Sequence, residues 1–283
     1  MRFLTDFAET FYQYSLDIFP YFLLAVIVTS FLQSYAKLSW LKGLLRQERG
    51  APLYTALLGG LLPLCSCSML PLANLINSLS RSYAPVLSFL VVAPVVSPVT
   101  LLLTYGYFGL SVTFWRLFGT LLFALLFAYA MGALFRKPTG IPLSVGGGAP
   151  GEGRVLAYLK SNLVGIGKYL LLGIFIASLI KSLFPPSFFS PLAGSLFSYL
   201  FLSLTSVPLY MCSGEEVPIA RALREMGFSE GRALSFMLGG TGVCLPTVLA
   251  TLKFLPKGLV LAYVLFWVLF SIAMGLFYDI LFQ

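Results

Sequence analysis

Residues 63–70 read PLCSCSML, and they interrupt a long apolar run with two cysteines and two serines. A second interruption, PLYMCSGEEVP at residues 208–218, repeats the order of a proline, a Cys-Ser pair and a further proline. When the chain is compared with itself at a shift of 147 residues, the two Cys-Ser pairs coincide, and so do Pro71 and Pro218. Polar residues and helix breakers match as well as leucines, so the sequence predicts an internal duplication of about half the chain.

The composition is typical of a protein with many membrane spans. Of 283 residues, 59% are hydrophobic and 10% are charged, whereas a soluble domain carries about 25% charged residues. The net charge is +8, but the basic residues stand at the ends of apolar runs. This placement favours a role in membrane topology over nucleic-acid binding. The chain has no histidine, so any site must use other ligands and other proton carriers.

The apolar segments predict an all-α polytopic membrane protein. About 20 apolar residues cross the hydrocarbon core as a helix, and four uninterrupted segments are long enough: residues 16–35, 108–135, 156–184 and 258–282. The stretch at residues 51–79 is divided by the Cys-Ser-Cys sequence into two arms that are too short to cross alone. We therefore expect a re-entrant hairpin there, with Cys65 and Cys67 at its tip.

Basic residues predict how the chain is oriented. Lysines and arginines follow the first span and also flank residues 137–153, so both loops should lie in the cytoplasm. Each half then contains about three full crossings plus one re-entrant hairpin, and an odd number of crossings makes the repeat inverted, as in many secondary transporters. The expected units are a first repeat at 1–136, a Gly/Pro-rich cytoplasmic linker at 137–153 and a second repeat at 154–283. The expected location is a bacterial inner membrane.

Four breaks in the apolar runs contain the candidate substrate site. They are the Cys-Ser-Cys sequence at residues 65–67, residues 93–98, the Cys-Ser-Gly-Glu-Glu sequence at residues 212–216, and residues 239–246. Non-helical backbone at membrane depth is tolerated only where it is buried in protein or lines a cavity. Prolines alone would explain kinks, but polar residues coincide with the prolines, and all four cysteines of the chain lie in the breaks. The predicted substrate-binding residues are Cys65, Ser66, Cys67, Ser68, Ser97, Cys212, Ser213, Thr241 and Cys244.

The cysteines favour a soft cargo. Cys65 and Cys67 precede a predicted short helix, as Cys212 does in the second half, and a helix N-terminus stabilises a thiolate. Several converging thiols favour cuprous ion, zinc, mercury or trivalent arsenic over hard cations. We therefore predict a metal or metalloid site of Cys65, Cys67 and Cys212, with Cys244 as a candidate fourth ligand.

Glu215 and Glu216 are the candidate coupling residues. Carboxylates at membrane depth commonly relay protons or balance the charge of a cation. The alternative is that they lie near the membrane interface and pair with Arg221, Arg224 or Arg232.

Two long strings resemble one known family. Residues 63–98, PLCSCSMLPLANLINSLSRSYAPVLSFLVVAPVVSP, and residues 208–246, PLYMCSGEEVPIARALREMGFSEGRALSFMLGGTGVCLP, are similar to the predicted permease family that includes the organoarsenical efflux permeases and candidate metal-efflux relatives. Members often have Asn where this chain has Ser97, Gly-Pro-Ala where it has residues 240–242, and Ser or Asn where it has Cys244. The resemblance implies a permease that exports its substrate, without naming the substrate.

These observations together predict a proton-coupled or facilitative exporter of a thiophilic substrate. Its partners would be that small molecule or ion and the lipid bilayer, with no nucleic acid, no cofactor and no enzymatic activity. One alternative is a transmembrane thiol-disulfide electron carrier in which Cys65 and Cys212 form a redox pair. A second is a structural membrane scaffold, in which changes at all four cysteines would leave function intact.

Overall fold

The part of the chain that the computed structural model describes is entirely helical. It comprises residues 50–62, 69–135, 137, 197–207, 214 and 216–282, together with a few scattered positions. The helices are α3 Ala51–Leu61, α4 Met69–Leu79, α5 Ala84–Val95, α6 Pro98–Leu134, α8 Phe197–Ser206, α9 Glu216–Glu225, α10 Glu230–Gly242, α11 Leu245–Thr251 and α12 Lys257–Phe282.

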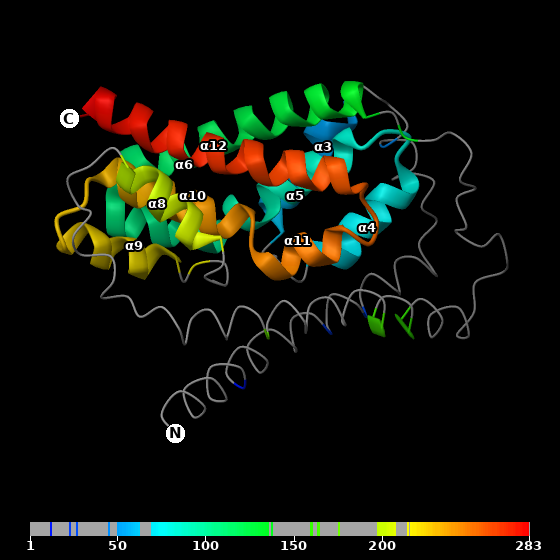
Figure 1. The fold of residues 1–283 in the computed structure, drawn as a ribbon, viewed down its shortest axis with the longest axis horizontal. Coiled ribbons are helices and arrows are strands. Elements are labelled where there is room, and N and C mark those ends of the chain that lie inside the picture. Colours follow the sequence, from blue (N-terminus) through cyan, green and yellow to red (C-terminus); the bar gives the residue numbers. More distant parts are fainter. Residues whose placement is uncertain are drawn as a thin grey trace, which may run out of the picture.

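Three helical stretches within these ranges are long and apolar enough to cross a membrane. They are α6, the stretch Glu230–Thr251 formed by α10 and α11, and α12. In the most apolar 18-residue part of α6 and of α12, 33% of the residues are buried, whereas 83% are buried in the corresponding part of Glu230–Thr251. The helices α6 and α12 therefore lie on the outside, where lipid would cover their apolar side chains, and α10 lies in the interior (Figure 1). This is the architecture of a multi-pass membrane protein.

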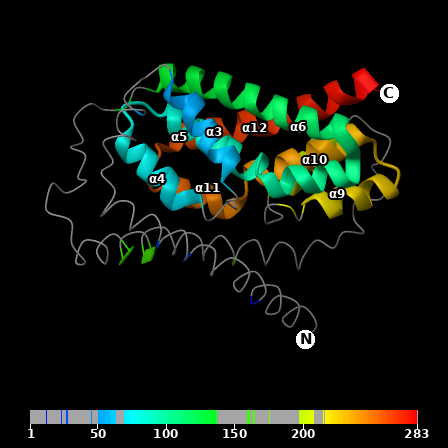
Figure 2. The same ribbon diagram turned by 180° about the vertical axis from the view of Figure 1, so that it is seen from behind.

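Helix α6 is a pair of arms that turn back at Gly109. That glycine has a φ of +79°, outside the helical range, and Arg116 Nη1 donates a hydrogen bond to Thr104 Oγ1 at 3.0 Å. Twelve residues of continuous helix would separate those two positions by about 18 Å. Residues 98–108 and 110–134 therefore lie side by side, with the turn at one end of the molecule (Figure 2).

The two central helices both end in breaks. Every residue of α5 is buried, as are most residues of α10. The helix α5 ends at Val95 and α6 begins at Pro98, while α10 ends at Gly242 and α11 begins at Leu245. Proline has no N–H to donate and fits best in the first turn of a helix, so Pro98 and Pro246 begin new helices rather than extending old ones. The breaks predicted at residues 93–98 and 239–246 are confirmed.

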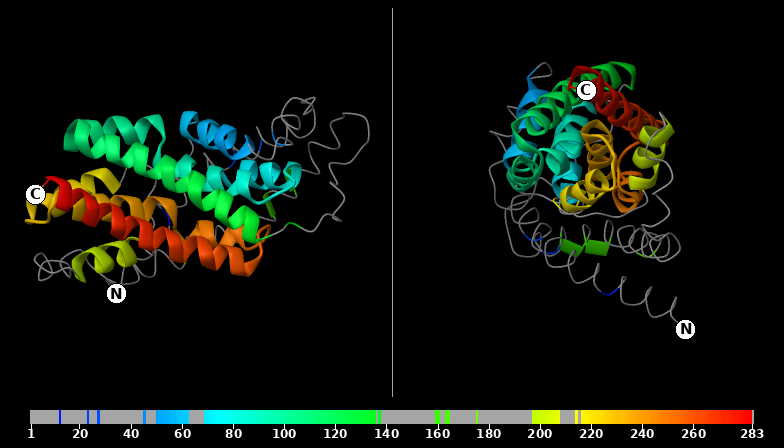
Figure 3. Two further views of the ribbon diagram at one scale, coloured as in Figure 1. Left: turned by 90° about the horizontal axis from the view of Figure 1, so that it is seen from above. Right: turned by 90° about the vertical axis from the view of Figure 1, so that its left-hand side faces the viewer.

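The two ends of the molecule are formed by different helices. The described helices form a bundle when seen near end-on (Figure 3). Helix α4 lies at one end and α9 at the other, and α11 runs from the middle toward α4 (Figure 1). At the first end Asn77 Nδ2 donates to the Phe254 carbonyl at 3.0 Å. Lys137 donates there to the Ser80 carbonyl at 3.0 Å, and burial lowers the pKa of Lys137. At the other end the Arg221 guanidinium lies 5.1 Å from the ring centre of Tyr107.

Candidate functional site

The structure describes four of the predicted site residues. Ser97, Glu216, Thr241 and Cys244 are all buried, with at most 2% of their surface exposed. The other predicted site residues lie outside the described residues: Cys65, Ser66, Cys67, Ser68, Cys212, Ser213 and Glu215. The short helices α4 and α9 do begin just after these cysteines, at Met69 and Glu216. The predicted metal set of Cys65, Cys67 and Cys212 therefore remains a prediction.

The first break lies between α5 and α6 and exposes a carbonyl group to side-chain donors. The Val95 carbonyl accepts hydrogen bonds from Thr100 Oγ1 and from Arg116 Nε, both at 3.1 Å. Ser97 has an extended backbone and caps α6, because its Oγ accepts a hydrogen bond from the Thr100 N–H at 3.3 Å. This pattern satisfies the backbone groups that a broken helix would otherwise leave unpaired.

The second break lies between α10 and α11 and is held by an aromatic side chain. The Gly242 carbonyl accepts a hydrogen bond from the Tyr263 hydroxyl at 2.5 Å. A Cβ atom at Gly242 would lie 2.0 Å from Trp267 Cε2, so only glycine lets this ring cover the break. Cys244 stands before α11, and its Sγ lies 2.8 Å from Thr247 Oγ1.

Thr241 is part of the α10 helix and does not extend into the break. Its Oγ1 donates to the Met237 carbonyl at 2.7 Å, four residues earlier. That bond is a common local arrangement for a threonine in a helix. The described geometry thus gives Thr241 a structural role, and its predicted contact with substrate stays untested.

Glu216 forms a fully buried ion pair with Arg116. Arg116 Nη2 lies 2.7 Å from Glu216 Oε1, and neither side chain has any exposed surface. The second oxygen, Oε2, accepts the N–H of Gly214 at 2.7 Å. Gly214 has a φ of +107°, which side chains other than hydrogen rarely allow. The remaining guanidinium contact is from Nη1 to Met237 Sδ at 3.6 Å.

The alternative partners suggested for Glu216 are wrong. Arg221 pairs with Glu225 at 3.0 Å, Arg224 pairs with Glu230 at 2.9 Å, and the Arg232 guanidinium lies 5.1 Å from the ring centre of Tyr199. The true partner lies 100 positions earlier in the chain, in the second arm of α6. Sequence reasoning failed because neighbours in sequence were considered first.

The ion pair joins the two parts of the chain beside the first break. Arg116 reaches the Val95 carbonyl and Glu216 at the same time, so one side chain connects α5, α6 and α9. Burying two charges costs several kcal/mol per ion even after relaxation, and good geometry only repays that cost. In membrane proteins such residues face the protein interior and mark transport pathways or coupling sites.

Arg116 and Tyr263 are functional candidates that the sequence analysis missed. The signal for Arg116 was present, because it is a charge in the middle of the apolar run 108–135. That run was long enough to predict a crossing in spite of one arginine. Tyr263 had no comparable signal, since tyrosine is common in apolar spans.

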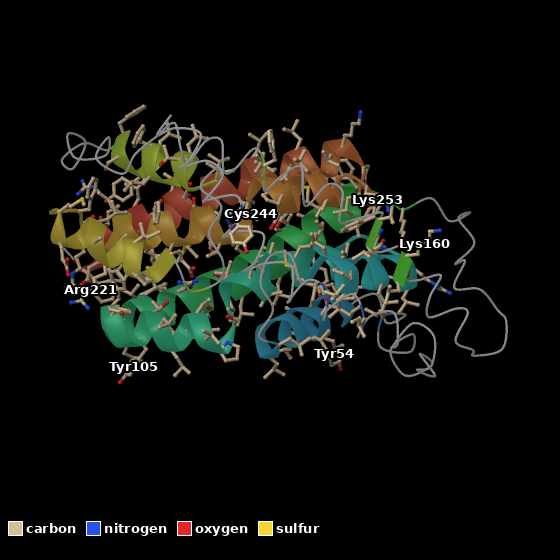
Figure 4. All side chains as sticks on the ribbon, turned by 90° about the horizontal axis from the view of Figure 1, so that it is seen from below. Tyr54, Tyr105, Lys160, Arg221, Cys244 and Lys253 are labelled. Atoms are coloured by element: carbon tan, nitrogen blue, oxygen red, sulfur yellow. The ribbon has the colours of Figure 1, made fainter. Side chains whose placement is uncertain are left out.

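The described residues contain no group of three or more His, Cys, Asp or Glu side chains that could hold a metal ion. A thiol site therefore needs the cysteines at residues 65, 67 and 212. Figure 4 shows Cys244 near the middle of the molecule, with Arg221 toward one end and Lys253 toward the other. The break that contains Cys244 thus lies about midway along the bundle, where a substrate site of a secondary transporter is expected.

Comparison with known proteins gives a consistent result. The profile of the ArsP_1 family, described as "Predicted permease", matches residues 4–141 and 157–280. The UPF0718 protein YcgR of Bacillus subtilis is 24% identical over 270 residues, 91% of this chain and 92% of its own. A Streptococcus mutans protein, named as a proposed two-component membrane permease complex subunit, is 24% identical over 239 residues, 80% of this chain and 79% of its own.

An archaeal relative is more similar over a shorter stretch. The UPF0718 protein MJ0584 of Methanocaldococcus jannaschii is 35% identical over 108 residues, which cover 38% of this chain and 30% of that protein. No solved structure matches the chain.

Proposed function

The chain belongs to the ArsP_1 family of predicted permeases, and on that premise we propose that it exports a thiophilic substrate across a bacterial inner membrane. The cargo would be a trivalent organoarsenical or a soft metal ion. The observation that carries the proposal is Cys244, a fully buried thiol in the break of a central helix about midway along the bundle. Soft cargo is best held by thiols, and half-helix ends at such breaks commonly form transport sites.

We propose that the two halves, residues 1–136 and 154–283, are inverted repeats joined by the linker at 137–153. The shift of 147 positions that aligns the two Cys-Ser pairs also lays α4, Met69–Leu79, over α9, Glu216–Glu225. The interruption in the family match between residues 141 and 157 agrees with a linker. About three full crossings plus one re-entrant hairpin in each half would make the repeat inverted.

Hydrogen bonds at the breaks support the duplication. The bond from Arg116 to the Val95 carbonyl has its counterpart, 147 positions later, in the bond from Tyr263 to the Gly242 carbonyl. The side-chain contact of Ser97 with Thr100 recurs at the same shift between Cys244 and Thr247. Related sequences that make the same contacts in the same places are best explained by one ancestral fold used twice.

Contacts at the two ends of the bundle support inversion. Asn77 of α4 bonds to the Phe254 carbonyl at one end. At the shift of 147 positions, Asn77 corresponds to Arg224 and Phe254 corresponds to Tyr107. At the opposite end of the bundle, Arg221 lies over the Tyr107 ring and Arg224 lies over the neighbouring Phe108 ring. A parallel repeat would place related contacts at the same end of the bundle, whereas an inverted repeat places them at opposite ends.

The proposed cargo site combines Cys65, Cys67 and Cys212 with Cys244. The first three precede the short helices α4 and α9, whose N-termini favour thiolates. The serines and threonine predicted beside them would line the same cavity. Glu216 would couple transport to a second ion or compensate the charge of the cargo, with Glu215 in a supporting role.

Uptake into everted membrane vesicles tests this function. Vesicles from cells that express the chain should accumulate a trivalent phenylarsenical, cuprous ion or zinc ion in a saturable manner, and Cys65→Ser/Cys67→Ser should abolish most of that uptake. Ser82→Ala, a change at an ordinary loop position, is the matched control. Unchanged uptake of the authentic substrate in the double variant would refute the thiol site.

Trapping of free thiols distinguishes the main alternative. A disulfide between Cys65 and Cys212 that cycles with a thioredoxin-like donor in growing cells would identify an electron carrier, whereas thiols that the cargo protects from alkylation support transport. Purified chain in liposomes adds a second arm. Because the Streptococcus mutans relative is named as a complex subunit, transport by the purified chain alone would show that no partner subunit is needed.

A further inference from the structure

The two breaks are held in the same way by different chemistry. Tyr263 holds the Gly242 carbonyl with a neutral hydroxyl, whereas Arg116 holds the Val95 carbonyl with a charged guanidinium. A hydroxyl is evidently sufficient to satisfy such a carbonyl. The positive charge at position 116 therefore needs a reason other than the integrity of the break, and its contact with Glu216 supplies one.

The charge is confined to one of the two related places. The position that corresponds to Arg116 at the shift of 147 is Tyr263, and the one that corresponds to Glu216 is Met69. Met69 and Tyr263 are both buried, so the second place fills its core without an ion pair. A buried ion pair can often be replaced by apolar residues with no loss of stability. Its presence in one copy alone points to a functional use of the charge.

We propose that Arg116 is the tethered counter-ion of Glu216, and that a proton competes with it for that carboxylate during the transport cycle. This deepens the proposed function and rests on it. In the state described here the guanidinium neutralises Glu216 and holds α9 against α6. A proton taken up from water at one membrane face neutralises the carboxylate instead and releases the guanidinium. Loss of that proton to the other face restores the pair.

A proton fits the site better than a metal ion. The two carboxylate oxygens already accept a guanidinium and a backbone N–H, and the described residues contain no cluster of metal ligands around them. A proton needs neither space nor additional ligands. Protonation leaves the positive charge on Arg116, whose guanidinium still has the Val95 carbonyl and the Thr104 hydroxyl as acceptors.

No other charge among the described residues faces Glu216. Helix α9 packs against α6 and α10. Arg116 is the basic residue of α6, and α10 carries Glu230 and Arg232 near its first turn, where Glu230 pairs with Arg224 of α9. The pair of Arg116 and Glu216 is therefore separate from the exposed ion pairs at the end of the bundle.

When α9 is released from α6, the first break loses one of its clamps. If the Arg116 side chain moves, its hydrogen bonds to the Val95 carbonyl and to Thr104 are lost. The Val95 carbonyl still accepts the hydrogen bond from Thr100. The break therefore remains hydrogen-bonded when Arg116 moves. Arg116 is therefore a positioning residue: when Glu216 is protonated, the contact that holds α9 of the second half against α6 of the first half is lost.

Accumulation at equilibrium tests the proposal, because it measures coupling and not the amount of folded protein. Purified full-length chain is placed in liposomes with a lumen one pH unit more acidic than the bath, with potassium and valinomycin holding the membrane potential near zero. Zinc ion is followed with a trapped indicator, and a trivalent phenylarsenical by mass spectrometry. One-for-one exchange with protons gives a lumen-to-bath ratio of about ten.

Three variants define the result. The wild type and Arg116→Lys, which keeps the charge, should reach a ratio near ten. The neutral double variant Arg116→Gln/Glu216→Gln should still admit cargo but should stop at a ratio near one. A purely structural pair would change only the time needed to reach the plateau. A double variant that reaches the wild-type ratio, or a wild type that stops at one, would overturn the proposal.

A measurement without cargo separates this proposal from the identity of the substrate. Infrared spectra of the purified protein at pH 7 should lack the carbonyl band of a protonated buried carboxyl group. Arg116→Gln should gain that band, because a buried carboxylate without a counter-ion takes up a proton, and the added Glu216→Gln change should remove it. If neither probe enters the liposomes, the proposed function fails while this test still applies. A folded Arg116→Gln protein without the band refutes the tethered counter-ion.

Discussion

Removal of one member of the buried pair should destabilise the protein far more than removal of both. Glu216→Leu leaves the Arg116 guanidinium unpaired at a position with no exposed surface, and such a loss costs about 3–5 kcal/mol. The Gly214 N–H also loses its acceptor, which adds about 1 kcal/mol. The double variant Arg116→Leu/Glu216→Leu buries no charge. Thr104 still donates to the Thr100 carbonyl and Thr100 still satisfies Val95.

We therefore expect the double variant to lie within about 2 kcal/mol of the wild type, and each single variant to be several kcal/mol less stable. The assay is reversible unfolding in mixed micelles, in which a denaturing detergent is titrated and helicity is followed by circular dichroism. The exposed pair of Arg221 and Glu225, at 54% and 66% exposure, is the control, with a coupling energy of about 0.5 kcal/mol or less. Additive losses in the double variant at the buried pair would refute the reasoning.

Three further predictions concern the frame around the site. Tyr263→Phe should leave the Gly242 carbonyl without its hydroxyl donor and lower the free energy of unfolding by about 1–3 kcal/mol in the same titration. Gly231→Ala places a Cβ atom 2.2 Å from a backbone carbonyl oxygen of α12 and should cost at least about 2 kcal/mol, whereas Gly106→Ala meets no atom within 4 Å and should be neutral or stabilising. Burial lowers the pKa of Lys137 below its usual 10.5. Between the lowered pKa of the folded state and the usual 10.5, the unfolded chain binds more protons than the folded chain, so the free energy of unfolding should rise with pH. Lys137→Gln should flatten that rise when unfolding is measured at several pH values.

Local features of this fold could be predicted from the sequence because they depend on nearby residues. Pro98 and Pro246 lie in the first turns of new helices whatever the surrounding fold, because the missing N–H and the ring clash of proline affect only the preceding turn. The short helices after the cysteine-containing stretches follow the same rule, and both were anticipated. The proposed duplication rests on the sequence in a similar way, because breakers and polar residues align at a constant shift.

Long-range pairing could not be predicted in this way. The partner of Glu216 is 100 positions away, and nothing in the order of residues brings α9 to the second arm of α6. The turn at Gly109 was also not expected, because residue 109 lies inside the span predicted at residues 108–135. In membrane spans, apolar pattern identifies the helices but gives little information on which faces meet, because lipid and core are equally apolar.

Ser97 and Cys244 occupy related positions in the two breaks but differ in chemistry. Both residues precede the second part of a broken helix, and both contact a threonine three positions later. Ser97 caps its helix through a backbone N–H, while Cys244 makes no such bond in the described structure. Serine is one of the best residues for this capping and cysteine is not. Thiols have a high affinity for soft ions, which is why Cys244 belongs to the cargo site proposed above. Arg116 and Tyr263 differ in the same way: each donates a hydrogen bond to a carbonyl at a break, one from a charged guanidinium and the other from a neutral hydroxyl. Chemistry that is specific to one half marks the positions where transport should be sensitive to substitution.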